Sequence, residues 1–262
     1  MDKINVYNLE GQIKTSLDLP LIFNVPPRLD LIRFACEVST SKNKQVQGRD
    51  KRAGLRNTAK GWGTGHGMSR APRIQGSGFS TARNVGRVPF AKGGRAAHAI
   101  KVEKKIEKKI NNKTKKLSLI SAISASGNQK LVKQRGHFVE EIPEIPLVID
   151  DKVQTVKKTR DIYEILCVLG LSKELHKIKN TKKIRPGKGK RRGRKYKIRK
   201  GPLLVIKDDF GIVKASKNIL GMDISKVDDL SVELLAPGAM PGRFIIWTQS
   251  AFNELNKYED LI

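Results

Sequence analysis

The chain has 262 residues, with 53 Lys and Arg against 25 Asp and Glu, and a formal net charge of +28. Positive charge on this scale indicates a polyanionic partner and favours nucleic acid. The only two cysteines, Cys36 and Cys167, lie far apart, which argues against a disulfide framework or a cysteine zinc site. Both are expected as buried free thiols. The sequence lacks a secretory signal and an 18-residue apolar run, which predicts a soluble, cytoplasmic protein.

The positive charge is concentrated in two segments. Residues 42–95 hold 13 Lys and Arg and one acidic residue, with 11 of the 23 glycines and only five Val, Ile or Leu. Residues 177–200 hold 14 Lys and Arg and no acidic residue, whereas the remaining 184 residues carry 26 basic and 24 acidic side chains. A segment so poor in apolar residues cannot offset the entropy of its own ordering unless an anion orders it.

These numbers predict one near-neutral domain with two cationic insertions. We expect a single α/β globular domain over residues 1–262, a long basic, glycine-rich internal loop at 42–95, and a second basic loop at 177–200. Below, residues 42–95 are called the basic loop and residues 177–200 the second basic segment.

The first elements of the chain read as a strand and a helix. Residues 4–9 alternate as a strand does, and Glu10 and Gly11 would turn it. Pro26 and Pro27 suit the first turn of a helix, and the apolar stripe that starts at Leu29 predicts that this helix ends near residues 39–41.

Beyond the basic loop the pattern becomes helical again. The spacing of Val102, Ile106 and Ile110 predicts that helix resumes after Ala96. A further stripe over residues 117–123 predicts a helix that Gly127 ends.

The next stretch mixes extended and helical patterns. Short extended segments are expected around residues 131–132 and at 146–149. Thr159 could cap a helix that Gly170 ends, and Ser172 would start another short helix.

Short apolar runs follow the second basic segment. Residues 202–206, 232–235 and 244–247 are typical of strands buried on both faces. A short helix is expected around residues 215–220, and Ser250 would cap a last helix. The alternation of strands and helices predicts an α/β fold whose mostly parallel sheet is flanked by helices.

The glycine clusters do not match known nucleotide loops. Residues 61–67 and 187–193 lack both phosphate-loop spacings, and no predicted strand precedes the first of them. Glycine instead allows the backbone to approach a phosphate closely.

Aromatic and histidine side chains are interleaved with the basic residues. Four side chains could stack on unpaired bases: Trp62, His66, Phe79 and Phe90. For Trp62, stacking on RNA and packing on its own loop both stay open. Phe90 lies near the loop root and is expected to anchor the loop. The four histidines lack metal-ligand spacing and are expected as surface or RNA-facing groups: His66, His98, His137 and His176.

Three pairs of acidic residues bear on the alternative of a nucleic-acid enzyme. Asp150–Asp151, Asp208–Asp209 and Asp228–Asp229 could bind Mg²⁺ in a nuclease, but each lies in a turn-like context that favours solvated turn residues. A nucleic-acid enzyme with basic clamp loops therefore remains only the alternative. We expect no catalytic residue, no cofactor, no metal and no small-molecule substrate.

Several motifs carry a family resemblance. They are Gly-Trp-Gly-Thr-Gly at 61–65, Gly-Gly-Arg with Ala-His at 93–98, Leu-Ala-Pro-Gly at 235–238, and Gly-Arg-Phe-Ile-Ile-Trp-Thr-Gln-Ser-Ala-Phe at 242–252. With these motifs in this order along the sequence, the chain resembles the large-subunit ribosomal protein L-four family in its archaeal and eukaryotic branch. The resemblance covers nearly the whole length of the chain. The long C-terminal extension of eukaryotic members is absent, which favours an archaeal protein.

The resemblance implies a structural component of the large ribosomal subunit in the cytoplasm. Its partners would be large-subunit rRNA and neighbouring ribosomal proteins, with no membrane. The basic loop would thread into the rRNA and help line the nascent-peptide exit tunnel. Feedback binding to a messenger RNA, as in some bacterial members, is a weaker possibility.

Carried onto this chain, the resemblance predicts two sets of rRNA-binding residues. The tip of the basic loop would lie near residues 56–73. At position 66 many relatives carry a basic residue, so the contact that His66 makes stays open. The loop set is Arg49, Lys51, Arg52, Arg56, Lys60, Trp62, His66, Arg70, Arg73, Arg83, Arg87, Lys92 and Arg95. The second set is Lys182, Lys183, Arg185, Lys188, Lys190, Arg191, Arg192, Arg194 and Lys195.

Overall fold

The computed structural model describes residues 3–261, and their side chains up to Tyr258. The chain forms two compact units. Unit 1 comprises the residues up to Thr40 and from Lys108 onward, and unit 2 is Ser41–Glu107.

A six-stranded sheet forms the centre of unit 1. Its strand order is β2-β1-β3-β8-β6-β7, and every neighbouring pair is parallel except β1 with β2. The predicted α/β fold with a mostly parallel sheet is therefore confirmed. The strands are β1 Lys3–Tyr7, β2 Ile13–Asp18, β3 Leu147–Ile149, β6 Leu203–Ile206, β7 Asp223–Lys226 and β8 Ile245–Thr248.

Three of the four inner strands, β3, β6 and β8, are buried along their whole length. Leu147 in β3 pairs with Ile246 in β8, and Leu203 in β6 pairs with Ile245. Every residue of β3, β6 and β8 is buried, as expected for a parallel sheet covered on both faces. The continuous apolar runs at 202–206 and 244–247 thus correctly predicted β6 and β8, and the extended segment expected at 146–149 is β3.

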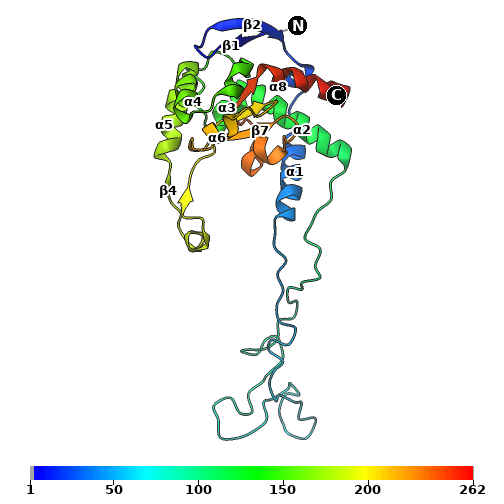
Figure 1. Ribbon diagram of the computed structural model, residues 1–262. Coiled ribbons are helices and arrows are strands. Elements are labelled where there is room, and N and C mark those ends of the chain that lie inside the picture. Colours follow the sequence, from blue (N-terminus) through cyan, green and yellow to red (C-terminus); the bar gives the residue numbers. More distant parts are fainter. Residues whose placement is uncertain (1–2, 262) are drawn as a thin grey trace. The chain divides into compact units, whose positions relative to one another are not determined.

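Helices cover the two faces of the sheet. One core cluster joins the sheet to α1, α2, α7 and α8, and the other joins it to α4, α5 and α6. Figure 1 shows α4 and α5 together on one side of unit 1 and α1 and α2 on the other. The helices are α1 Leu29–Lys42, α2 Asn112–Gly127, α3 Gln129–Arg135, α4 Thr159–Leu166, α5 Ser172–Asn180, α6 Ile212–Ser216, α7 Val232–Leu235 and α8 Gln249–Asn253.

Two segments predicted as extended are helical. Residues 131–132 lie in α3, where the Asn128 side chain accepts a hydrogen bond from the Lys130 amide. Residues 232–235 form α7, which Ser231 caps by accepting from the Leu234 amide. Short apolar runs do not distinguish helix from strand, and the capping side chains decide these two cases.

The predicted helix after Ala96 is absent from the structure. Residues 96–111 are extended or turn-like, and α2 begins only at Asn112. At the start of this segment the Ile100 carbonyl instead accepts from the Arg49 amide at 2.9 Å, a backbone pair within unit 2.

Other corrections concern element ends and two missed strands. The helix α1 begins two or more residues after Pro26 and Pro27, so neither proline lies in its first turn. The predicted caps Thr159 and Ser250 lie inside α4 and α8. The helix α6 starts before the predicted 215–220. The edge strands β2 and β7 were not predicted because neither is a continuous apolar run.

Candidate nucleic-acid interface

Unit 2 consists of two arms and a turn-rich part between them (Figure 1). The arms are joined by the backbone bond from Arg49 to Ile100 and by the 2.9 Å ion pair of Lys51 with Glu103. A side chain at Gly48 would collide with Val102, since a Cβ there would lie 2.3 Å from its methyl carbon. The two arms therefore pack closely without forming a regular sheet.

The turn-rich part has its own backbone pairing. Lys60 and Arg73 exchange two hydrogen bonds of 3.0 Å, and Arg73 also bridges to Val85. Ala59 is fully buried between these segments. The basic loop is thus ordered locally by a few backbone pairs and not by an apolar core.

Two predicted RNA-binding arginines lie half-buried in this framework. Arg87 donates from Nε to the Asn57 side chain at 3.2 Å and from Nη2 to the Asn57 carbonyl at 2.9 Å. Arg73 donates from Nη1 to the Arg83 carbonyl at 3.1 Å and lies 5.9 Å from the Trp62 ring. These bonds occupy part of the N–H groups of both guanidinium groups within the loop itself.

Arg87 should therefore stabilise the loop itself. Replacing it with alanine removes both bonds to Asn57, and we expect amide hydrogen exchange at Lys60 and Arg73 to accelerate roughly tenfold, the effect of about 1.4 kcal/mol. Arg52→Ala removes an exposed arginine of the same loop and should leave these rates unchanged. Equal amide exchange rates at Lys60 and Arg73 in wild type and in Arg87→Ala would contradict the role of Arg87 in stabilising the loop.

Most of the other predicted loop residues are exposed. Arg56 pairs with Asp50 at 2.6 Å, and Lys51 pairs with Glu103. Trp62 is half-buried, with its ring 5.5 Å from that of His66. The exposed members are Arg49, Lys51, Arg52, Arg56, Lys60, His66, Arg70, Arg83, Lys92 and Arg95.

Phe90 does not anchor the loop within this chain. Its side chain is 81% exposed, so the prediction that it packs at the loop root is wrong. Phe79 is also exposed but lies over Gly76, where a Cβ would be 2.7 Å from the ring.

The second basic segment forms a small hairpin in unit 1. Strands β4 (Lys183–Ile184) and β5 (Tyr196–Lys197) pair antiparallel, and Lys188–Arg192 makes a helical turn between them. Arg185 is half-buried and donates from Nε to the Arg194 carbonyl at 3.2 Å. The other predicted members are exposed: Lys182, Lys183, Lys188, Lys190, Arg191, Arg192, Arg194 and Lys195.

Cations from both ends of this segment hold its root. Lys177 donates to the Gly136 carbonyl at 3.1 Å, and Arg199 donates to the same oxygen at 2.5 Å. Gly136 ends α3 with a φ of 94°, and a helix C-terminus attracts positive charge. Lys177 and Arg199 therefore fix the hairpin to the body.

Beside this root lies a buried pair that the sequence did not reveal. His137 Nδ1 is 2.8 Å from a Glu174 carboxylate oxygen, and both side chains are almost fully buried. The prediction that His137 is a surface or RNA-facing group is therefore wrong, whereas His66, His98 and His176 are exposed. Asp150 is likewise buried and pairs with Lys14 at 2.9 Å, so it is not a solvated turn residue.

The pair is a neutral histidine beside a carboxylate. Burial lowers the pKa of His137, and the hydrogen bond to Glu174 only partly opposes this. Burial acts to raise the pKa of Glu174, but hydrogen bonds from His137 and the Phe138 amide and nearby positive charge leave that pKa below its ordinary value.

His137 should make stability depend on pH. His137 binds a proton more tightly in the unfolded chain than in the folded protein. The free energy of unfolding therefore has its full value above the ordinary histidine pKa of about 6.5 and falls as the pH drops below it. We expect the urea midpoint to fall between pH 7.5 and 5.5, and to fall less in His137→Asn. His176→Asn should retain the wild-type fall, and an identical fall in His137→Asn would contradict the assignment.

No metal site accompanies these residues. Among the described side chains, residues 3–258, no group of three or more His, Cys, Asp and Glu is placed to hold a metal ion. No helix in residues 3–261 is long and apolar enough to cross a membrane.

Comparison with known proteins gives a family match over most of the chain. Residues 17–258 match the family described as "Ribosomal protein L4/L1 family". The match includes all residues of both predicted RNA-binding sets.

Individual relatives are large ribosomal subunit proteins named uL4 or uL4B. The chain is 43% identical over 255 residues to large ribosomal subunit protein uL4 of Methanosphaera stadtmanae, covering 97% of this chain and 96% of that protein. It is 42% identical over 256 residues to uL4 of Methanococcus aeolicus, covering 97% and 99%. It is 39% identical over 254 residues to uL4B of Schizosaccharomyces pombe, covering 97% of this chain and 70% of that protein.

Proposed function

The chain belongs to the ribosomal protein L4/L1 family, and from this premise we propose that the basic loop and the second basic segment bind large-subunit rRNA, and that the basic loop helps line the nascent-peptide exit tunnel. The protein is a structural component of the large ribosomal subunit and not an enzyme. Neighbouring ribosomal proteins would be its other partners.

Unmatched positive charge is the observation that carries the RNA-binding proposal. Residues 41–107 contain 16 Lys and Arg and three acidic residues. Within this part of the described chain, only Lys51 and Arg56 form ion pairs with carboxylates. The remaining exposed cations would repel one another unless a polyanion neutralises them.

Exposed or half-buried rings among these cations favour RNA over a simple anionic surface. Trp62, His66, Phe79 and Phe90 lie among the arginines, and none of them is fully buried. Unpaired RNA bases stack on aromatic rings and arginine planes, whereas phosphate takes the charged groups.

The glycines of residues 61–67 support close contact of the backbone with a partner. Gly63, Gly65 and Gly67 have φ values of 79°, 92° and 62°, and a Cβ at any of them would meet nothing within 4 Å. Their backbone conformation requires glycine, while the open space beside them leaves room for RNA. This is the part of the loop for which we propose the tunnel-wall position.

The alternative of a nucleic-acid enzyme has no support from these residues. The acidic pairs do not form a metal-binding group among the side chains of residues 3–258. Asp151 instead accepts from the Ser250 amide at 3.0 Å, and Asp209 accepts from the Gly211 amide at 2.9 Å. Family membership agrees with a structural role.

Trypsin protection tests the proposal. We expect the exposed arginines of the basic loop to be cut in the isolated protein and protected in purified large subunits. The control is isolated protein digested in high salt, where no RNA is present to protect the loop. Equal cleavage of the loop in free protein and in subunits would contradict the proposal.

A further inference from the structure

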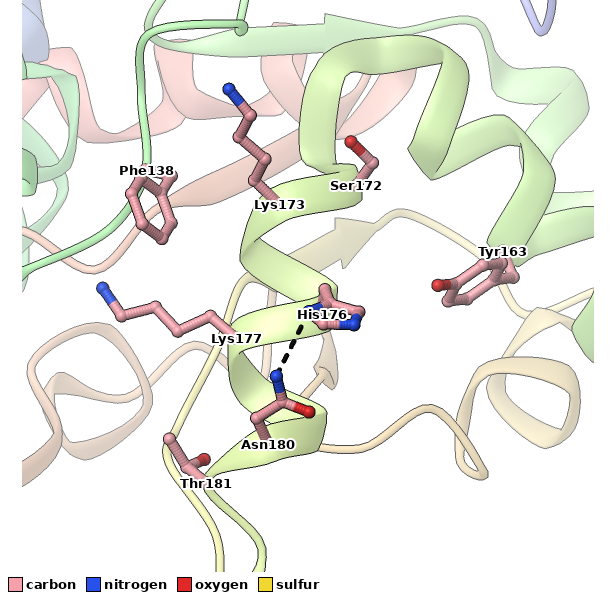
Figure 2. Close-up of a pocket in the computed structure, with 8 residues that line it drawn as sticks. All are labelled: Phe138, Tyr163, Ser172, Lys173, His176, Lys177, Asn180 and Thr181. Atoms are coloured by element: carbon pink, nitrogen blue, oxygen red, sulfur yellow. Dashed lines mark hydrogen bonds between the residues drawn. The ribbon is translucent and has the colours of Figure 1, made fainter.

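A shallow depression lies over the outer face of α5, outside the basic loop. Figure 2 shows Phe138 on one side of α5 and Tyr163, from α4, on the other, with His176 between them. Lys177 and Asn180 complete the set. We call these five residues, Phe138, Tyr163, His176, Lys177 and Asn180, the α5 platform.

The two rings of the platform are open to solvent. Phe138 is 41% exposed and Tyr163 is 44% exposed. The Lys177 ammonium lies 4.2 Å from the centre of the Phe138 ring, so that ring already has a cation over one face. The Tyr163 ring has no such cover, which leaves it as the surface on which a flat group can stack.

The polar groups between the rings are held in position. His176 Nδ1 and Asn180 Nδ2 are 3.2 Å apart, as the dashed line in Figure 2 marks. With the Asn180 amide donating to Nδ1, the His176 proton lies on Nε2. The pair then offers two donors, at His176 Nε2 and at the second Asn180 Nδ2 hydrogen, and one acceptor at Asn180 Oδ1. Such a pair matches the edge of a nucleobase.

The charge of the depression suits a phosphate. Its lining includes Lys173 and Lys177 and no acidic residue, although Lys173 pairs with Glu141 at 2.7 Å beside it. Lys177 is oriented by two contacts, the Phe138 ring and the Gly136 carbonyl. Orienting a lysine in advance lowers the entropy lost when it binds an anion.

The platform is continuous with the second basic segment. α5 ends at Asn180, and the hairpin begins three residues later with β4. At its start the Lys182 ammonium lies 4.9 Å from the Tyr196 ring, a second cation–aromatic pair. An RNA strand held by the hairpin would therefore reach the platform without a break in positive charge.

We propose that the α5 platform binds an unpaired nucleotide of large-subunit rRNA. Its base stacks on Tyr163, its edge meets His176 and Asn180, and its phosphate contacts Lys177. This inference rests on the proposed rRNA binding and adds a binding site on the body of the protein. An acidic segment of a neighbouring protein would use the lysine but would leave Tyr163 and the His176–Asn180 pair without a role.

Ultraviolet crosslinking in assembled large subunits tests this site. Irradiation at short wavelength joins stacked bases to aromatic rings, and mass spectrometry locates the nucleotide adducts on peptides. We expect an adduct on the peptide that contains Tyr163, and about a tenfold lower yield there in Tyr163→Leu. Phe210→Leu changes another exposed aromatic side chain of the body, outside the platform, and should leave the yield unchanged.

The adducts of the basic loop distinguish the possible failures. Adducts on the loop with none on α4 or α5 would overturn the platform and leave rRNA binding intact. A protein crosslink at Tyr163 in place of a nucleotide would assign the surface to a neighbouring protein and also overturn it. No adduct anywhere on the chain would instead contradict the proposed function.

Discussion

Replacing Arg243 with methionine should lower the free energy of unfolding by about 3–5 kcal/mol, the range for breaking a buried charged network. Arg243 is only 1% exposed, and it donates to the carbonyls of Gly201 and Leu234, each at 2.8 Å. It also pairs with Asp223 at 2.7 Å. Methionine fills similar space but leaves the two carbonyls without this donor, while Asp223 keeps only its contact with Lys200.

Urea unfolding measured by circular dichroism checks this effect. Arg243→Lys keeps the charge but cannot reproduce the forked contacts, so it should recover only part of the loss. The control is Arg28→Met, which removes an exposed pair with Asp30 and should hardly change the midpoint. A midpoint for Arg243→Met close to that of the control would contradict the structural role of Arg243.

Neutralising the basic loop should weaken rRNA binding by a much larger factor. The variant changes six exposed positions to glutamine: Arg49, Arg52, Lys60, Arg70, Lys92 and Arg95. If each contacts one phosphate, the slope of log affinity against log salt should become shallower by about 4–5. Affinity for large-subunit rRNA at physiological salt should then fall roughly 10³–10⁴-fold.

A variant of equal charge controls for net charge alone. It changes six exposed lysines of the body to glutamine: Lys116, Lys152, Lys158, Lys214, Lys217 and Lys226. Filter binding over a range of salt concentrations should show a nearly unchanged slope for this control. Equal loss in the two variants would mean that overall charge, and not the basic loop, determines binding.

Sequence patterns predicted the parts of the fold that depend on neighbouring residues. The fully apolar runs of β6 and β8 indicate strands covered on both faces, and β3 matches the short extended segment expected there. The stripe of α1 indicates an amphipathic helix. Where a run was short, as at α7, the pattern could not decide between helix and strand.

Contacts between distant segments could not be predicted in this way. His137 meets Glu174 after 37 residues, and Arg243 meets Gly201 after 42. A charged residue in a sequence reads as exposed unless its partner is known, because burial of a charge is costly without one. These partners become neighbours only when the sheet and its helices assemble.

The candidate interface was predictable in its extent but not in its internal order. Charge and glycine content marked the basic loop and the second basic segment. No pattern indicated that Asn57 binds Arg87, or that Arg185 supports its own hairpin. Composition therefore locates a basic segment, whereas only the fold separates arginines used inside it from arginines free to bind RNA.

Photo-crosslinking from the loop tip tests the central claim most directly. A photoreactive phenylalanine derivative would replace Trp62 in ribosomes that hold a stalled, radiolabelled nascent peptide. The proposed function predicts crosslinks from this position to large-subunit rRNA and to the nascent peptide. Crosslinks confined to proteins of the subunit's outer surface, with neither rRNA nor nascent peptide among the products, would contradict it.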